Sequence, residues 1–459
     1  MDPATRARYN AWKRRKLLKL AAISIGILIV LGSVVAFGLR LGDDDNGNGV
    51  IVNGTVTNEP TLNQDPDINT DPSNEEEGTR PSDELESTTT IRLQFAGDIF
   101  LHQGPMAAAR ISERTYDFRP FFTHIKPFID ADLAIANMEV PVDAFGDNLH
   151  LASFPLFNSP FEILDGLQYA GFNHLISANN HSFDKGFEGL LNTINSFERA
   201  GIAHTGMNAN WDDFHTPTII DVNGINVGIL SYTDSVNGQE WSVPEASRAY
   251  AVRRFRSHTT EDVAQITQDM NELRTAGAEL VIVALHWGAE YGDAPSDMQR
   301  MIASELVDAG ADIIMGKHSH TVHPVRWHYR SDGSRGFIMY SLGNFLADQT
   351  RLTSPSVHAQ ITEAWTHHQF IGRTQFGMLV SIEATRQADG QIELETAHIL
   401  PTLCMRDFTG NTLGSADDVT ILPLVNGEAP DFVIEEDIRL WGRTAYEHVA
   451  NIVGSGFIE

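Results

Sequence analysis

The stretch ADIIMGKHSH, residues 311–320, passes directly from a buried apolar run into residues that bind metals. Its first half is apolar almost throughout, as in a parallel strand covered on both faces. Gly316 then precedes His318 and His320, two imidazoles two residues apart. In an open α/β sheet, ligands bind outside the carboxyl ends of the strands. This order therefore predicts a ligand site at the end of the strand.

Five other strings in the chain have the same order, a predicted strand followed by polar residues. The strands are IRLQFA (91–96), LAIA (133–136), HLISA (174–178), ELVIVAL (279–285) and GFIMYSL (336–342). The polar residues that follow are Asp98 with His102, Asn137 with Glu139, Asn180 with His181, His286, and Asn344. We expect them to converge on one crevice. Carboxylates, imidazoles and an amide suit a hard-to-borderline divalent metal, and their number allows two ions.

Several of these residues have a plainer interpretation when taken alone. Asp98 suits a turn in which it caps its own backbone. His102 suits a surface position, and His286 ends a run so apolar that it suits a core histidine. The shared position of all six strings after buried strands favours a common site over these alternatives.

His181 and Asp184 form a candidate catalytic pair. A histidine beside a metal-binding amide such as Asn180 can hydrogen-bond to a leaving group or protonate it. Asp184, three residues later, is in reach to orient that histidine. The alternative is an Asn-rich turn that opens the helix beginning at Gly186.

The globular part alternates strands with helices, which predicts an α/β fold. We expect helices at residues 161–170, 186–200, 261–277 and 296–309, with glycines at or just after the ends of the last three. Asn223-Gly224 and Asp389-Gly390 each predict a β-hairpin. Residues 404–459 contain one further expected helix, 435–452, and no recognisable chemistry.

The first ninety residues predict a membrane anchor and a tether. Residues 1–19 are basic, and 20–39 (LAAISIGILIVLGSVVAFGL) carry no charge over roughly 30 Å of helix. The basic flank places the N-terminus in the cytoplasm and the rest outside. A cleaved signal peptide is the rival, but the run is long and no good cleavage site follows. Residues 40–90 are acidic and poor in large apolar side chains, as in a disordered linker.

The composition excludes some classes of function. The 459 residues carry a net charge of −29, so the chain lacks the basic footprint that nucleic acid requires. Cys404 is the single cysteine, which excludes an intramolecular disulfide framework and a cysteine-based zinc site.

The ordered set GD, ANMEVPV, SANNHSFDKG, LHWGAEY, GKHSHTVHPV and YSLGNF resembles the bacterial capsule-synthesis CapA (PgsA-like) family. The resemblance covers about residues 91–350. That family is similar in fold to calcineurin-like metallophosphoesterases. The resemblance implies a four-layer α/β/β/α sandwich over residues 91–403, a C-terminal extension over 404–459, and a two-metal site.

The resemblance also implies a role for each matching residue. Asp98 and His320 would bind the first metal, Glu139 would bridge, and Asn180, His286 and His318 would bind the second. His181 would be the catalytic histidine. The chain departs from the phosphoesterase pattern twice, both times at the first metal. Three residues instead of one separate Asp98 from His102, and the bridging residue is Glu139 rather than an aspartate.

Family members are associated with the synthesis or membrane transport of poly-γ-glutamate. The resemblance therefore implies a role in capsule synthesis or export, with that polymer and membrane synthase subunits as partners. Numerous imidazoles favour Mn, Fe or Zn over Ca in the site. Two alternatives stay open: a cell-envelope metal-dependent phosphoesterase unrelated to capsule, and a non-catalytic accessory subunit of the synthase. Whether the chain is an enzyme is thus left open by its sequence.

Overall fold

The computed structural model describes residues 88–143, 146–148, 150–349, 372–406, 419–428 and 436–458. The predicted basic tail, the anchor at 20–39 and nearly all of the predicted linker lie outside these ranges. Within them, no helix has both the length and the apolar character needed to cross a bilayer.

An eight-stranded sheet contains the strands that precede Asp98, Glu139 and Asn180. Its order is β14-β13-β12-β1-β2-β3-β4, and β11 also pairs with β1. The parallel strands are β1 (Thr89–Phe100), β2 (Leu133–Met138), β3 (His174–Ile176), β4 (Ala203–Thr205) and β11 (Asn344–Ala347). The antiparallel strands are β12 (Phe376–Arg386), β13 (Ile392–Arg406) and β14 (Val419–Pro423).

A six-stranded sheet contains the strands that lead to His286, His318 and His320. Its order is β5-β6-β7-β8-β10-β9. Its four central strands are parallel: β6 (Ile225–Thr233), β7 (Leu280–His286), β8 (Ile313–Lys317) and β10 (Arg335–Met339). Antiparallel strands form both edges, β5 (Ile219–Val222) and β9 (Val325–Tyr329).

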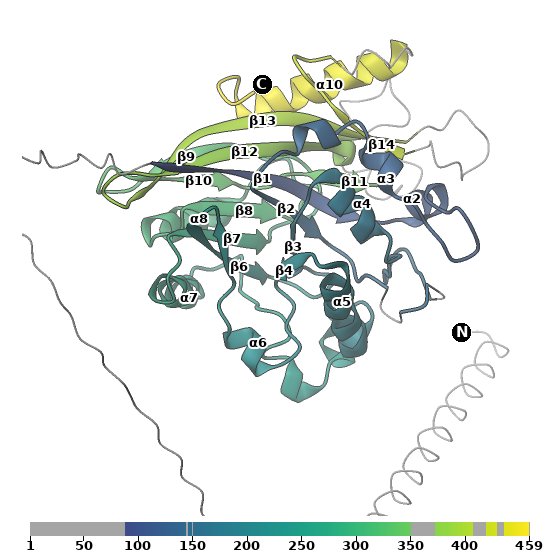
Figure 1. Cartoon of the computed structure of the whole chain (residues 1–459), viewed down its shortest axis with the longest axis horizontal. Helices are drawn as coiled ribbons and strands as arrows, with labels where there is room; N and C mark the ends of the chain where they lie inside the picture. The colour runs from purple at the N-terminus through teal and green to yellow at the C-terminus, as the bar shows by residue number, and fades with distance from the viewer. Residues whose placement is uncertain are drawn as a thin grey trace, which may run out of the picture. The chain divides into compact units, whose positions relative to one another are not determined.

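Helices cover the outer faces of the two sheets, so the order of layers is helix, sheet, sheet, helix (Figure 1). Along β7, Ile282 and Ala284 face the core between the sheets, whereas Val281 and Val283 face the helices. Both faces are buried, which is why the run is apolar throughout. The helices on the eight-stranded sheet are α2 (Gln103–Ala108), α3 (Arg119–Phe122), α4 (Ile163–Ala170) and α5 (Gly186–Ala200). Those on the six-stranded sheet are α7 (Val263–Thr275) and α8 (Asp297–Asp308).

The predicted α/β class is confirmed, and local sequence signals account for several element ends. Helix α5 has the predicted bounds. Helix α8 begins at a capping box, in which Ser296 Oγ accepts from the backbone of Gln299 and the Gln299 side chain accepts in return. The turn Asn223-Gly224 joins β5 to β6 with φ of 50° and 88°, as a type I′ hairpin requires.

Two segments differ from expectation. The predicted strand 336–342 ends early, because β10 stops at Met339 and the chain crosses to the other sheet. Asn344 therefore begins β11 beside Asp98 instead of ending a strand. The residues expected as a C-terminal extension complete the first sheet: β13 continues to Arg406 and pairs with β14. Helix α10 (Glu436–Val453) packs on β12 and β13 and adds apolar side chains to the core between the sheets (Figure 1).

Candidate metal centre

Most of the predicted ligands meet where the carboxyl ends of the two sheets face each other. Two groups of buried side chains bring their ligand atoms within 4.8 Å of one another. The first group is Asp98, Glu139 and His320, and the second is Glu139, His286 and His318. Glu139 belongs to both groups, so it is the residue that two bound ions would share.

Gly97 brings Asp98 into place by a close approach of two backbones. A Cβ at Gly97 would lie 1.9 Å from the carbonyl oxygen of Gly343, so no other residue fits without moving the chain. The Asp98 amide donates to that carbonyl at 3.0 Å. Its carboxylate is fully buried, accepts from Asn137 Nδ2 at 2.7 Å, and lies 3.3 Å from His320 Nδ1.

One oxygen atom of Glu139 has no hydrogen-bond partner among the described residues. Its Oε1 lies 3.5 Å from His286 Nε2 and 3.6 Å from His320 Nε2, yet has no hydrogen-bond partner in the described structure. Burial, reinforced by the neighbouring Asp98, raises the pKa of Glu139 well above its ordinary value. A cation between the two imidazoles and this carboxylate oxygen would satisfy all three groups.

Asn344 fixes the orientation of His320. Its Nδ2 donates to Gln349 Oε1 at 2.9 Å and to the Thr374 carbonyl at 2.7 Å, which identifies the other atom as oxygen. That Oδ1 lies 3.0 Å from His320 Nδ1, so Nδ1 carries the hydrogen. The Nε2 atom of His320 is then left as a ligand, oriented by a partner on the far side of the ring.

Asn180 and two histidines build the second group. Asn180 Oδ1 lies 3.0 Å from His286 Nε2, and the rings of His286 and His318 are 4.4 Å apart. Burial, then the neighbouring His318, lowers the pKa of His286 well below its ordinary value, so the imidazole is neutral and able to bind a metal. The Nδ1 atoms of His286 and His318 are buried and have no hydrogen-bond partner among the described residues.

The backbone after β8 is strained at both histidines. His318 has φ of 98° and His320 has φ of 58°, conformations that cost about 1–3 kcal/mol each for a residue with a side chain. Gly316 precedes them with no room for a side chain, since a Cβ would lie 2.1 Å from the Tyr340 carbonyl oxygen. These backbone conformations direct both imidazoles toward Glu139.

His181 and Asp184 form the expected pair beside this cluster. His181 Nδ1 lies 2.8 Å from Asp184 Oδ2, which also accepts from the Phe157 backbone at 2.8 Å. Both residues are buried, with His181 6% exposed. Asp184 thereby orients the His181 ring through Nδ1 and leaves Nε2 as the nitrogen available for proton transfer.

His102 does not join either group of ligand atoms. Strand β1 continues past Asp98 to Phe100, and the His102 ring packs edge-on against Phe100 at 4.6 Å and Phe157 at 5.5 Å. Because three residues separate His102 from Asp98, the His102 ring lies among these aromatic side chains. For this reason it lies outside both ligand groups.

Lys317 is a site residue that the sequence analysis did not single out. It is 1% exposed, and its Nζ donates to the Ala178 carbonyl at 2.8 Å, linking β8 to the turn that holds Asn180. Burial lowers its pKa to about 7, although Asp98 and Glu139 favour the charged form. The feature of the sequence that points to Lys317 as a site residue is its position between Gly316 and His318.

The donor set fits divalent cations. The first group offers two carboxylates and one imidazole, and the second offers one carboxylate, two imidazoles and an amide oxygen. Mixed oxygen and nitrogen ligands of this kind suit Mn, Fe or Zn. Glu139 Oε1, the carboxylate oxygen without a hydrogen-bond partner in the described structure, is an atom that a cation in this position would satisfy.

The proteins similar to this chain include one solved nucleotidase structure and two curated capsule proteins. NAD nucleotidase from Haemophilus influenzae aligns with a TM-score of 0.40 and 12% sequence identity, covering 81% of this chain and 64% of that one. The capsule biosynthesis protein CapA of Bacillus anthracis is 30% identical over 268 residues, 56% of this chain and 60% of that protein. The PGA biosynthesis protein CapA of Bacillus subtilis is 29% identical over 266 residues, 57% of this chain and 65% of that protein.

The chain thus spans about six tenths of the length of these two relatives. The family model for bacterial capsule synthesis protein PGA_cap matches residues 92–349, which include both groups of candidate ligands and the His181–Asp184 pair. The match extends over more than half of the chain, and we conclude that this protein belongs to the bacterial capsule synthesis protein PGA_cap family.

Proposed function

We propose that this protein acts in the synthesis or export of poly-γ-glutamate, through a dinuclear metal centre of metallophosphoesterase type. Family membership supports the capsule process. The observation that supports metal chemistry is the pair of buried ligand groups sharing Glu139. The order of ligands along the chain, Asp98, Glu139, Asn180, His286, then the two histidines after β8, supports the phosphoesterase relationship.

The proposed chemistry is hydrolysis or transfer at an amide or phosphate ester. Two divalent cations would supply Lewis acidity and an activated water there. Asp98, Glu139 and His320 would hold one of them, and Asn180, His286 and His318 the other. Asp184 holds the His181 ring through Nδ1, and His181 in its doubly protonated form would give its Nε2 proton to the leaving group.

A deletion strain tests the capsule role. Cells that lack this protein should form no cell-associated poly-γ-glutamate, and expression of the full chain should restore it. The polymer is measured as acid-released glutamate after removal of free amino acids. Normal polymer in the deletion strain would favour the alternative of an envelope phosphoesterase unrelated to capsule.

We further propose that the globular part of the chain from residue 91 onward, here called the head, lies outside the cell. An uncleaved membrane anchor at residues 20–39 would attach it to the cell. The apolar run and its basic flank support this topology. Protease added to intact cells or spheroplasts should then remove the head while leaving cytoplasmic markers whole. Protection of the head until the membrane is opened would contradict the topology.

A further inference from the structure

The loop that joins β7 to α8, residues 287–296, is bonded to the segment that carries the two histidines after β8. The Trp287 amide donates to the Lys317 carbonyl at 3.2 Å, and the Tyr291 amide donates to the Ser319 carbonyl at 2.8 Å. Because both bonds are made between backbones, they fix the loop relative to the candidate metal ligands.

Tyr291 is held in this loop in a strained conformation beside the first ligand group. Its φ of 63° costs about 1–3 kcal/mol for a residue with a side chain, a cost that is typical of functional sites. Its ring lies 5.8 Å from the His320 ring, and its hydroxyl oxygen accepts from Gln349 Nε2 at 3.4 Å. The residue before it, Glu290, is exposed and so is accessible to a substrate.

The Glu290 carboxylate acts on ligands of both groups. Burial lowers the pKa of His318, and Glu290 opposes this shift more than any other neighbouring charge does. Burial, then Asp98, raises the pKa of Glu139, and Glu290 adds to that shift. Burial, then Glu290, raises the pKa of Tyr291 as well. One exposed carboxylate thus lies beside the place where the two ligand groups meet.

This negative charge is not offset by a basic side chain of the protein. Within the described ranges, no salt bridge involves Glu290. A second carboxylate, that of Asp234, accepts from the Gly288 amide at 3.2 Å and acts on His318 in the same sense. The exposed side of the centre therefore carries negative charge, which favours a positively charged group on whatever binds there.

The polymer of the proposed function has such a group at one place. Every residue of poly-γ-glutamate carries a carboxylate, and Glu290 would repel these along the length of the chain. The amino end carries the one ammonium group of the chain. A divalent cation attracts carboxylate and amide oxygens, whereas Glu290 attracts the ammonium. The two charges together favour the amino end of a chain over its middle.

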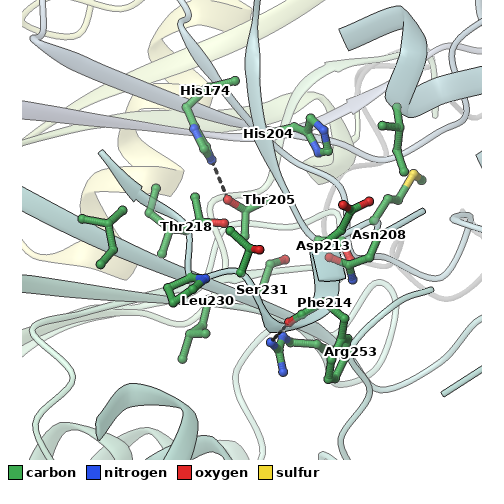
Figure 2. Close-up of a pocket in the computed structure, with 18 of the residues that line it drawn as sticks. His174, His204, Thr205, Asn208, Asp213, Phe214, Thr218, Leu230, Ser231 and Arg253 are labelled. Atoms are coloured by element: carbon green, nitrogen blue, oxygen red, sulfur yellow. Dashed lines mark hydrogen bonds between the residues drawn. The ribbon is translucent and has the colours of Figure 1, made fainter. Parts of the chain in front are cut away.

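A cavity of about 450 Å³ at the edge of the sandwich offers no better place for the polymer, and neither Glu290 nor any candidate metal ligand lines it (Figure 2). Among the described residues that line it, Arg253 has the permanent positive charge. The Arg253 guanidinium donates to the Phe214 carbonyl at 2.5 Å and to Asp269 Oδ2 at 3.0 Å, so it is already paired within the protein. We therefore look for recognition of the polymer at the metal centre.

We propose that Glu290 is a specificity-determining residue that binds the terminal ammonium of a γ-glutamyl chain, so that the metal centre takes the amino end of the polymer. The inference deepens the proposed function and rests on it. It depends on the fixed loop beside both ligand groups, on the exposure of Glu290, and on the charge that no basic side chain offsets within the described ranges.

Two peptides test the proposal on the full chain loaded with Mn or Zn. One is γ-linked triglutamate with a free amino end, and the other is the same peptide acetylated at that end, so they differ by one ammonium. Each is made from L-glutamate and from D-glutamate. In at least one series, titration calorimetry should show the free peptide binding about tenfold or more tightly, the effect of one close charge pair. Equal binding, or tighter binding of the acetylated form, would overturn the proposal.

Two variants assign the preference to Glu290. Glu290→Gln should bind the free and the acetylated peptide about equally, because the ammonium has lost its partner. Glu305→Gln, which makes the same change of charge at an exposed position of α8, should keep the wild-type preference. Melting curves and metal content verify each variant.

The outcomes separate this inference from the proposed function. A preference that persists in Glu290→Gln, or that Glu305→Gln removes equally, would refute the role of Glu290 while the polymer remains the ligand of the centre. Binding of neither peptide by the metal-loaded wild type would contradict the inference and the role of the polymer together.

Discussion

Glu139→Gln is expected to abolish metal binding at both positions of the centre. Its Oε1 atom is the shared ligand atom, 3.5 Å from His286 and 3.6 Å from His320, and it has no other partner in the described structure. Loss of an orienting partner outside the ligand set typically costs about 10–100-fold in affinity. Loss of a shared ligand should therefore cost more than this at each ion. Metal titration followed by calorimetry measures the effect.

Asn344→Ala is the matched control for that experiment. Asn344 does not belong to either ligand group but orients His320, so its loss should weaken the affinity for the first ion about 10–100-fold and leave the second ion in place.

The metal-free Glu139→Gln protein should have a melting temperature no lower than that of the metal-free wild type at neutral pH. The raised pKa of Glu139 means that the folded state disfavours its ionised form, and glutamine removes that penalty. Unchanged metal affinity in Glu139→Gln would refute the shared-ligand assignment.

His181→Asn is expected to lower turnover or polymer production by about 10²–10⁴-fold, the usual worth of a general acid. The variant should keep its metal content, because His181 belongs to neither ligand group. Asp184→Asn should have a smaller effect of the same kind, because it acts through His181 Nδ1. The measurement is polymer per cell in a strain whose only copy carries the variant.

Full capsule formation with His181→Asn would contradict the hydrolytic mechanism. The remaining explanation would be a non-catalytic accessory subunit of the polymer synthase, with the metal centre serving the fold. Loss of both metal and polymer in this variant would instead make His181 a structural ligand. The two results are separated by measuring metal content and polymer on the same strains.

Much of this architecture could be predicted because its signals are local. Helix α5 has the bounds that the sequence predicts, and Gly201 follows its last residue. The hairpin at Asn223-Gly224 follows from a turn that requires positive φ at both residues. The convergence of Asp98, Glu139 and His320 follows from one rule, that parallel strands present their carboxyl ends at one edge.

The remaining features depend on contacts between distant segments. Nothing local indicates that the chain leaves the second sheet after Met339 and that Asn344 pairs beside Asp98 in the first. The buried position of His102 depends on its packing against Phe157, which is far along the chain. The burial of Lys317 depends on its contact with the Ala178 carbonyl, which lies in the turn after β3 and far from Lys317 along the chain.

The most direct test of the dinuclear centre is anomalous diffraction from crystals of the protein loaded with Mn or Zn. The account predicts two peaks on either side of the Glu139 carboxylate, one beside Asp98 and His320 and the other beside Asn180, His286 and His318. A matching solution analysis should find two ions per chain, both lost in the His318→Ala/His320→Ala double variant. A single peak away from Glu139, or metal content unchanged by the double substitution, would contradict the account.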